Sequence, residues 1–160
     1  MRIQQSELCR WILGTESVFG YYGILTLHTI GMGIVVSISA CIELRVLGFA
    51  PGLSLAPLEQ FFPLLWLGFW INALSGTILL ATDATNKLVS VDFYLKMTLI
   101  AVAVVTLQMV RKDIFRRDAI DAAPLSTRVK TLAFLSLACW LGAIISGRLL
   151  PYVVGTGGPK

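Results

Sequence analysis

The stretch SVFGYYGILTLHTIGMGIVVSISACI, residues 17–42, runs for 26 positions without an Asp, Glu, Lys or Arg. A helix needs about 20 predominantly apolar residues to cross the hydrocarbon core of a bilayer, so this stretch predicts a membrane-spanning helix. Near its middle lies His28, the only histidine of the chain. An ionisable residue at this depth is costly without a partner, and His28 is therefore the first candidate for a functional role.

The composition of the whole chain places it among integral membrane proteins. It is 56% hydrophobic and 14% charged over 160 residues, against about 25% charged in a typical soluble domain. Three further runs are free of charged side chains: Gln60–Thr82, Met97–Val110 and Thr131–Gly147. We therefore predict one all-α domain over residues 1–160, an integral membrane four-helix bundle whose spans cover approximately 18–44, 60–82, 92–111 and 129–153.

The ends and loops of these spans predict how the chain meets the lipid headgroups. Leu8, Trp11 and Ile12 follow i, i+3, i+4 spacing, which is typical of a short amphipathic helix lying in the membrane interface. The net charge of +4 indicates anionic headgroups as partners rather than nucleic acid, because the basic residues border the spans. The basic loop 112–128 is predicted to be cytoplasmic, which places both termini outside.

Small side chains at four-residue intervals indicate where helices approach one another, because packing in lipid depends on close contact. Three such stripes occur: Thr29, Gly33, Ser37 and Cys41; Gly68, Asn72 and Gly76; Cys139, Ala143 and Gly147. Asn72 is expected to form a hydrogen bond to a facing helix. Glu43 and Arg45, at the end of the first span, are assigned structural roles as well. The three cysteines, at positions 9, 41 and 139, show no spacing typical of disulfides or zinc, and we assign them no role.

Several interpretations of His28 remain open. The simplest is an interhelical hydrogen bond, to Asn72 or to a serine. In the second, His28 is an axial ligand of b-type haem, and the second ligand comes from another protomer or from a methionine. Lys96 and Arg148 would lie at the same membrane face and pair with the haem propionates.

The remaining interpretations involve other ligands. Met32 lies one helical turn after His28, and imidazole with thioether suits copper(I). A proton or substrate path is also open, although Glu43, Asp83 and Asp92 all lie at span ends. The sequence contains no phosphate loop, nucleophile–base pair or zinc-protease motif, so independent catalytic activity is not expected.

Several short motifs in order resemble a known family. They are Trp11-Ile12-x-Gly14-Thr15, Leu27-His28-x-x-Gly31, the segment from Glu43 to Gly48, Phe93-x-x-Lys96, and Gly147-Arg148. This order resembles a widespread family of small bacterial four-helix membrane proteins catalogued as a domain of unknown function. The resemblance implies a bacterial inner-membrane location and recurring positions at His28, Arg45, Lys96 and Arg148, but no activity. The chain departs from the pattern at Glu43, where Asp is expected, and at Met32, where Leu is more usual.

From these observations the sequence predicts a haem-binding, electron-transfer module that uses His28, in a homo-oligomer or as a subunit of a membrane complex. The cofactor-binding residues would be His28, Lys96, Arg148 and Met32, and His28 would be the metal ligand. The alternative is a structural or accessory subunit in which His28 only packs. A further alternative is a copper-handling membrane protein. Asn72, Gly68, Gly76, Gly33, Glu43 and Arg45 are predicted to support the packing.

Overall fold

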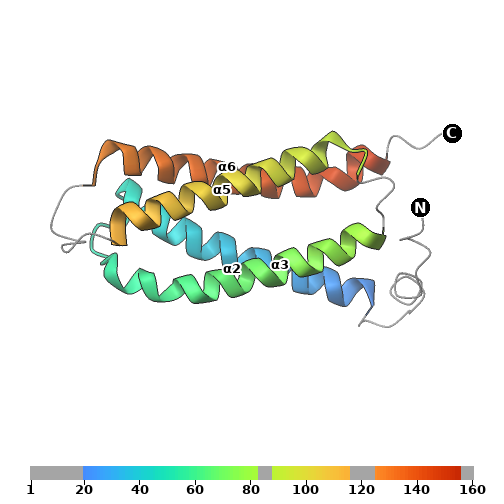
Figure 1. Cartoon of the computed structure of the whole chain (residues 1–160), viewed down its shortest axis with the longest axis horizontal. Helices are drawn as coiled ribbons and strands as arrows, with labels where there is room; N and C mark the ends of the chain where they lie inside the picture. Colours follow the sequence, from blue (N-terminus) through green and yellow to red (C-terminus); the bar gives the residue numbers. More distant parts are fainter. Residues whose placement is uncertain (1–19, 83–87, 116–124, 156–160) are drawn as a thin grey trace.

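The computed structural model describes residues 20–82, 88–115 and 125–155, with side chains up to residue 147. These residues form four long α-helices and one short 3-10 helix. In chain order they are α2 (Tyr21–Leu47), η2 (Ala56–Phe61), α3 (Phe62–Thr82), α5 (Val91–Phe115) and α6 (Thr127–Gly155) (Figure 1). The all-α four-helix bundle is confirmed, whereas the predicted interfacial helix over residues 1–16 lies outside the described residues.

Each long helix is long and apolar enough to cross a membrane, which makes this a multi-pass membrane protein. The boundaries differ from the predicted ones by a few residues. The first helix does not end at 44 but continues to Leu47, because a charged side chain does not itself interrupt backbone hydrogen bonding. It ends at Gly48, whose φ of 102° is the left-handed conformation that glycine adopts readily. The second span is preceded by η2, which has a proline in its first turn.

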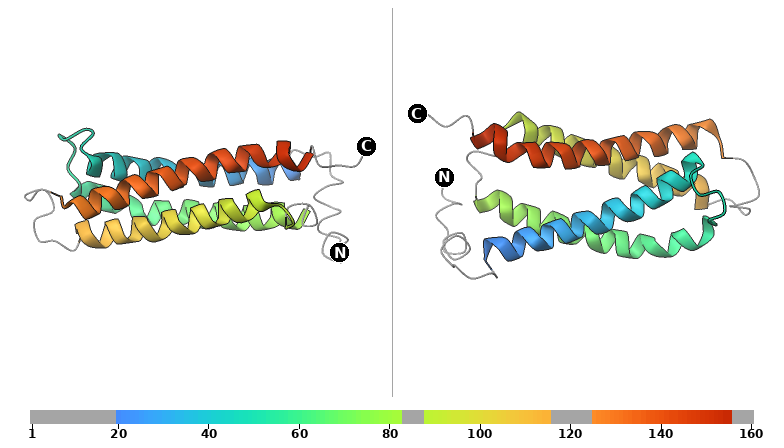
Figure 2. Two further views of the ribbon diagram at one scale, coloured as in Figure 1. Left: turned by 90° about the horizontal axis from the view of Figure 1, so that it is seen from above. Right: turned by 180° about the vertical axis from the view of Figure 1, so that it is seen from behind.

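The helices form two antiparallel hairpins, α2 with α3 and α5 with α6. The hairpins meet mainly through α2 and α6, whereas α3 has few contacts with α5. Figures 1 and 2 show the four helices side by side along one long axis. The carboxyl ends of α2 and α5 lie at the same end of the bundle as the starts of α3 and α6. We call this the loop end, and the opposite end, where α2 begins, the His28 end.

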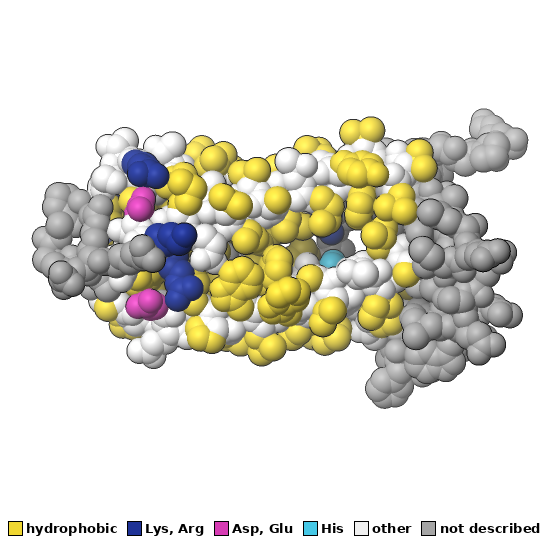
Figure 3. Space-filling model, viewed as in Figure 1, with side chains coloured by type: hydrophobic (Ala, Val, Ile, Leu, Met, Phe, Trp, Pro, Cys, Tyr) yellow, Lys and Arg dark blue, Asp and Glu magenta, His cyan; other side chains and the backbone are white. Residues whose placement is uncertain are grey.

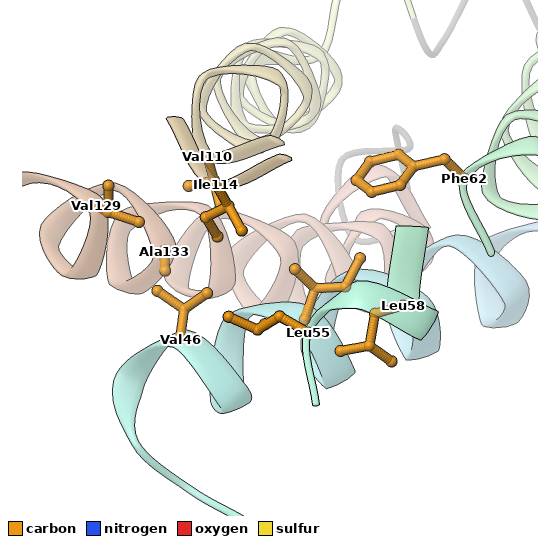
Figure 4. Close-up of a cluster of buried hydrophobic side chains, with 9 residues drawn as sticks. Val46, Leu55, Leu58, Phe62, Val110, Ile114, Val129 and Ala133 are labelled. Carbon is orange, nitrogen blue, oxygen red and sulfur yellow. The ribbon is translucent and has the colours of Figure 1, made fainter. Parts of the chain in front are cut away.

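A cluster of buried apolar side chains closes the loop end, and we call it the apolar plug. It consists of Ile42, Val46, Leu55, Leu58, Phe62, Val110, Ile114, Val129 and Ala133. Figure 4 shows these side chains converging from all four helices and from the connection between α2 and α3. Each is at most 6% exposed, so the plug fixes how the two hairpins meet.

The outside of the bundle is apolar along most of its length (Figure 3). Large exposed side chains on all four helices include Leu27, Trp70, Val105 and Phe134, which are 49–64% exposed. Lys and Arg side chains gather at the loop end in the view of Figure 3. An apolar band beside a charged end is the pattern of a protein in contact with lipid tails and headgroups, and lipid contact is thus the expected environment of these faces.

Candidate functional site at the interface of α2 and α3

The imidazole of His28 is half-buried and joins α2 to α3. Its Nδ1 lies 3.0 Å from the backbone oxygen of Asn72 and 3.1 Å from Oγ of Ser75. In return, Nδ2 of Asn72 donates to the backbone oxygen of His28 at 2.8 Å. The predicted interhelical hydrogen bonds of His28 and Asn72 are therefore confirmed, and they join the same pair of residues in both directions.

These contacts decide which ring nitrogen carries the proton. A backbone carbonyl only accepts hydrogen bonds, so Nδ1 must be the N–H donor to Asn72. The Ser75 hydroxyl donates to the backbone oxygen of Ile71 at 2.6 Å, and its oxygen can therefore accept from Nδ1 as well. In the neutral imidazole the other nitrogen, Nε2, then carries a lone pair.

Glycines allow this close approach of the two helices. A Cβ atom at Gly31 would lie 2.8 Å from the backbone nitrogen of Asn72 and from the backbone oxygen of Gly68. A Cβ at Gly68 would lie 2.8 Å from the side chain of Ile34, and one at Gly76 would lie 3.0 Å from Cε1 of His28. Gly68 and Gly76, for which packing roles are predicted, thus lie in this contact, and Gly31 completes it.

Gly33 does not take part in the packing between the described helices of this chain. Among the described atoms outside the neighbouring turns of α2, none lies within 4 Å of a Cβ built at Gly33, and the whole stripe of Thr29, Gly33, Ser37 and Cys41 is exposed. The face of α2 that points into the bundle is shifted by two residues from this stripe. It carries the buried residues Gly31, Val35 and Ser39. Small residues occur on both faces of α2, so their spacing alone does not reveal which face points inward.

Lys96 lies at the His28 end, as predicted, and passes close to α6. Its Nζ would be 3.3 Å from a Cβ atom at Gly147, so the absence of a side chain at Gly147 makes room for the ammonium group. Cys139 and Ala143, the other members of that stripe, are 6% and 4% exposed. Arg148 follows Gly147 in α6, but its side chain lies outside the described residues.

A small cavity lies between the two hairpins, next to this site. Its volume is about 20 Å³, which is room for about one water molecule. The lining residues come from all four helices: Met32, Val35, Val36, Phe69, Asn72, Lys96, Ile100, Trp140, Ala143 and Ile144. In Figure 3 the histidine is visible at a hollow between two layers of apolar side chains. Met32 thus shares a cavity with Lys96, but the cavity is far too small for a porphyrin.

Glu43 and Arg45 both have packing roles, of different kinds. Arg45 donates from Nε to the backbone oxygen of Leu53 and so ties the end of α2 to the following connection. Glu43 is 0% exposed, although it lies only one turn from the end of α2. Sequence reasoning located Glu43 at a span end but missed its burial. Gly31, Val35, Ser39 and Glu43 lie four residues apart on one helical face, but this spacing does not by itself show that the face points inward.

The described residues contain no group of three or more His, Cys, Asp or Glu side chains that could hold a metal ion. Cys41 is exposed and Cys139 is buried, and both are free thiols; Cys9 lies outside the described residues. Among the described residues, His28 is therefore not part of a cluster of such ligands.

No family model, no curated protein and no solved structure matches this chain.

Proposed function

We propose that this chain is a membrane-embedded, haem-binding electron-transfer module with His28 as one axial ligand. The observation that carries the proposal is the hydrogen bond from Nδ1 of His28 to the backbone oxygen of Asn72. Metal-ligating histidines almost always donate their second ring N–H to a carbonyl, a carboxylate or water, which fixes the ring and raises the basicity of the ligating nitrogen. His28 has this arrangement, and Ser75 supports it from the same helix.

The charge at this end of the bundle suits the propionates of a haem. Lys96 lies beside the cavity that Asn72 also lines, and an ammonium group pairs readily with a carboxylate. Arg148 follows directly after Gly147 in α6. We assign Lys96 and Arg148 as the anionic-group partners of the cofactor. The haem itself would supply one-electron chemistry, at a potential that depends on its axial ligands.

The size of the cavity bears on how many copies of the chain are needed. A cavity of about 20 Å³ excludes a porphyrin from the interior of a single packed copy, and the chain has one histidine. We therefore infer a shared site, in which a second copy contributes its His28 or a methionine as the sixth ligand. The few contacts between α3 and α5 would allow the two hairpins to separate on this side.

The test is the absorption spectrum of the full chain purified in mild detergent from cells with ample haem. We expect a Soret band and a sharp α-band on reduction, both lost in His28→Ala. Thr29→Ala is the matched control, because Thr29 is the next residue on α2 and its hydroxyl bonds only within the helix, to Leu25. Colourless, iron-free protein would overturn the proposal.

The second candidate is a structural or accessory subunit, and the reciprocal bonds between His28 and Asn72 favour it. Those bonds give Nδ1 of His28 and Nδ2 of Asn72 their partners without any cofactor. In that case His28→Ala changes the stability of the bundle but no spectrum, and elemental analysis finds no metal. The same analysis tests the copper alternative with His28 and Met32, since copper would be found in place of iron.

We further propose that the chain lies in a bacterial inner membrane with its loop end in the cytoplasm. The described basic residues at that end are Arg45, Arg111, Lys112, Arg128 and Lys130, and cytoplasmic loops carry an excess of Lys and Arg. A reporter enzyme active only outside the cytoplasm, fused after residue 160, should be active. The same reporter inserted between residues 115 and 125 should be inactive, and the opposite result would reverse the orientation.

A further inference from the structure

Glu43 is a carboxyl group enclosed inside the bundle. Its side chain is 0% exposed, and neither carboxyl oxygen has a hydrogen-bond partner among the described residues. An ionised carboxylate in apolar surroundings without a partner costs far more than the stability of a domain, so such a group takes up a proton instead. The oxygens are also closed off from solvent, which leaves no space for a hydrated cation.

Two hydroxyls accompany this carboxyl. Ser39 lies one turn before Glu43 on α2, is 0% exposed, and its Oγ also has no partner within the described part of the chain. Ser136 of α6 lies beside the carboxyl, and its hydroxyl donates to the backbone oxygen of Ala103 at 3.2 Å. Cys139 of α6 is the titratable side chain that faces Glu43 there. The group therefore has polar neighbours that carry no formal charge.

Glu43, Ser39 and Ser136 form a polar pocket that is enclosed by more buried apolar side chains on one side than on the other. Towards the loop end lies the apolar plug, in which nine buried side chains contain no polar atom. Towards the His28 end lies a thinner cluster of Val35, Ala103, Cys139 and Trp140. Two of its members, Val35 and Trp140, also line the cavity of about 20 Å³. One layer of mainly apolar side chains, in which the buried indole N–H of Trp140 has no partner among the described residues, thus separates the cavity from the turn that carries Ser39.

We propose that Glu43 is a proton-binding site inside the bundle, and that its proton enters and leaves through the cavity at the His28 end. On release, the carboxyl O–H bond breaks, the proton passes to water admitted past Val35, and the carboxylate remains until a proton returns. The Ser39 hydroxyl can receive a hydrogen bond from the acid or donate one to the carboxylate, whereas Ser136, whose proton goes to Ala103, offers its oxygen to the acid. The proposal concerns the protein chain alone and does not depend on haem.

Infrared spectroscopy of the full chain in lipid nanodiscs tests the bound proton. At neutral pH we expect the carbonyl stretching band of a protonated carboxylic acid, absent in Glu43→Gln. The control is Glu59→Gln, because Glu59 is at the surface beside Arg111, and it should retain the band. If Glu43→Gln fails to assemble, Glu43→Asp is used, and the band should then move rather than vanish. A wild-type spectrum without a band that depends on residue 43 overturns the proposal.

Exchange into heavy water tests the route, since the band shifts as O–H becomes O–D. Val35→Ala removes two methyl groups from the layer beside the cavity. Val110→Ala is the matched control, because it removes two methyl groups from the plug. The side chains of Val35 and Val110 are 2% and 0% exposed. We expect Val35→Ala to speed exchange about tenfold and Val110→Ala to change it by less than about twofold. Equal effects, or a larger effect of Val110→Ala, would overturn the route through the cavity.

Discussion

The two halves of α2 hold polar groups in different ways. His28, at one end, has hydrogen bonds to a backbone oxygen and a hydroxyl of α3. Glu43, about four turns further along, is enclosed completely, and its oxygens have no partner in the described ranges. The difference follows from the neighbouring helix. At His28 the glycines of α2 and α3 bring the backbones together, whereas Glu43 lies beside the hydroxyl of Ser136 and next to the apolar plug, with no backbone oxygen as a partner in the described ranges.

In lipid, close contact between helix backbones provides hydrogen-bond partners for polar side chains, whereas packing between large apolar side chains does not. Where helices touch closely, carbonyl groups become available as partners for a side chain on the facing helix. Where large side chains separate the helices, a polar group must be neutral or be satisfied within its own helix. The predictions below test each half of α2 in turn, and then the charged surface that borders the plug.

The largest expected effect is on the close approach at the His28 end. Gly31→Leu places side-chain atoms where backbone atoms of Asn72 and Gly68 lie 2.8 Å from the Cβ position. Backbone cannot move aside as a flexible side chain does, so we expect a loss of about 3 kcal/mol or more, measured by reversible unfolding in mixed micelles. Gly33→Leu, on the open face of the same helix, should change stability by less than about 0.5 kcal/mol. Equal losses would mean that α2 packs in another register.

The next effect concerns the apolar half. Ile42→Ala removes a side chain that is 1% exposed in the plug and leaves a cavity. In lipid the transfer of apolar surface from water does not contribute, because the lipid tails are as apolar as the plug. The loss should therefore lie at the low end of the range for such substitutions, about 2 kcal/mol. Ile145→Ala is the control, since Ile145 is 58% exposed and should change the unfolding midpoint little. A midpoint in Ile42→Ala that equals the control would show that the plug does not hold the hairpins together.

A smaller effect is expected at the hydrogen bonds of the His28 end. Asn72→Leu removes the donor to the backbone oxygen of His28 but keeps the backbone oxygen that accepts from Nδ1. Interhelical hydrogen bonds in membranes contribute about 0.6–2 kcal/mol, so we expect a loss of about 1 kcal/mol in the same unfolding assay. Thr77→Val is the matched control, because the hydroxyl of Thr77 bonds within its own helix, to Ala73. A loss of stability in Thr77→Val as large as in Asn72→Leu would contradict this account.

These comparisons also show what the sequence could and could not predict. Four charge-free runs predicted four spans, two of them long enough by themselves and two extended past Lys96 or Arg148 to about 20 residues or more, because the bilayer imposes length and composition directly. The partner of His28 was predicted as Asn72 or a serine, and both Asn72 and Ser75 are present at Nδ1. A polar residue in the middle of a span has few possible hydrogen-bond partners, so the partner of His28 could be predicted from a short set of candidates.

The direction in which each face points was harder to predict. Gly31 and Gly33 are two positions apart and chemically identical, yet Gly31 is buried against α3 while Gly33 is exposed. Lipid-facing and protein-facing positions in this chain are both apolar, so hydrophobic periodicity carries little information about burial. The burial of Glu43 escaped prediction for the same reason. Only contacts between helices reveal which face of α2 is interior.

The smallest expected effect is at the surface of the loop end. Arg111 lies 3.9 Å from a carboxyl oxygen of Glu59, and its guanidinium stacks 4.4 Å above the ring of Phe62. Both charged side chains are more than a third exposed, at 37% and 46%, and an ion pair that is screened by water in this way contributes about 0–0.5 kcal/mol. The cation–π contact contributes about 0.5–1 kcal/mol, so it should dominate.

Two substitutions separate these two contributions. Arg111→Ala removes both contacts and should lower the stability by about 1 kcal/mol, whereas Glu59→Gln removes only the ion pair and should lower it by less than half as much. The unfolding midpoints of the two variants at low and high salt distinguish the ion pair from the cation–π contact, since salt screens the ion pair more than the contact with the ring. If Glu59→Gln lowered the stability as much as Arg111→Ala, and if this loss vanished at high salt, the ion pair rather than the cation–π contact would stabilise this surface. Because Phe62 belongs to the plug, the opposite result would show that Arg111 stabilises the apolar half of the bundle by covering it.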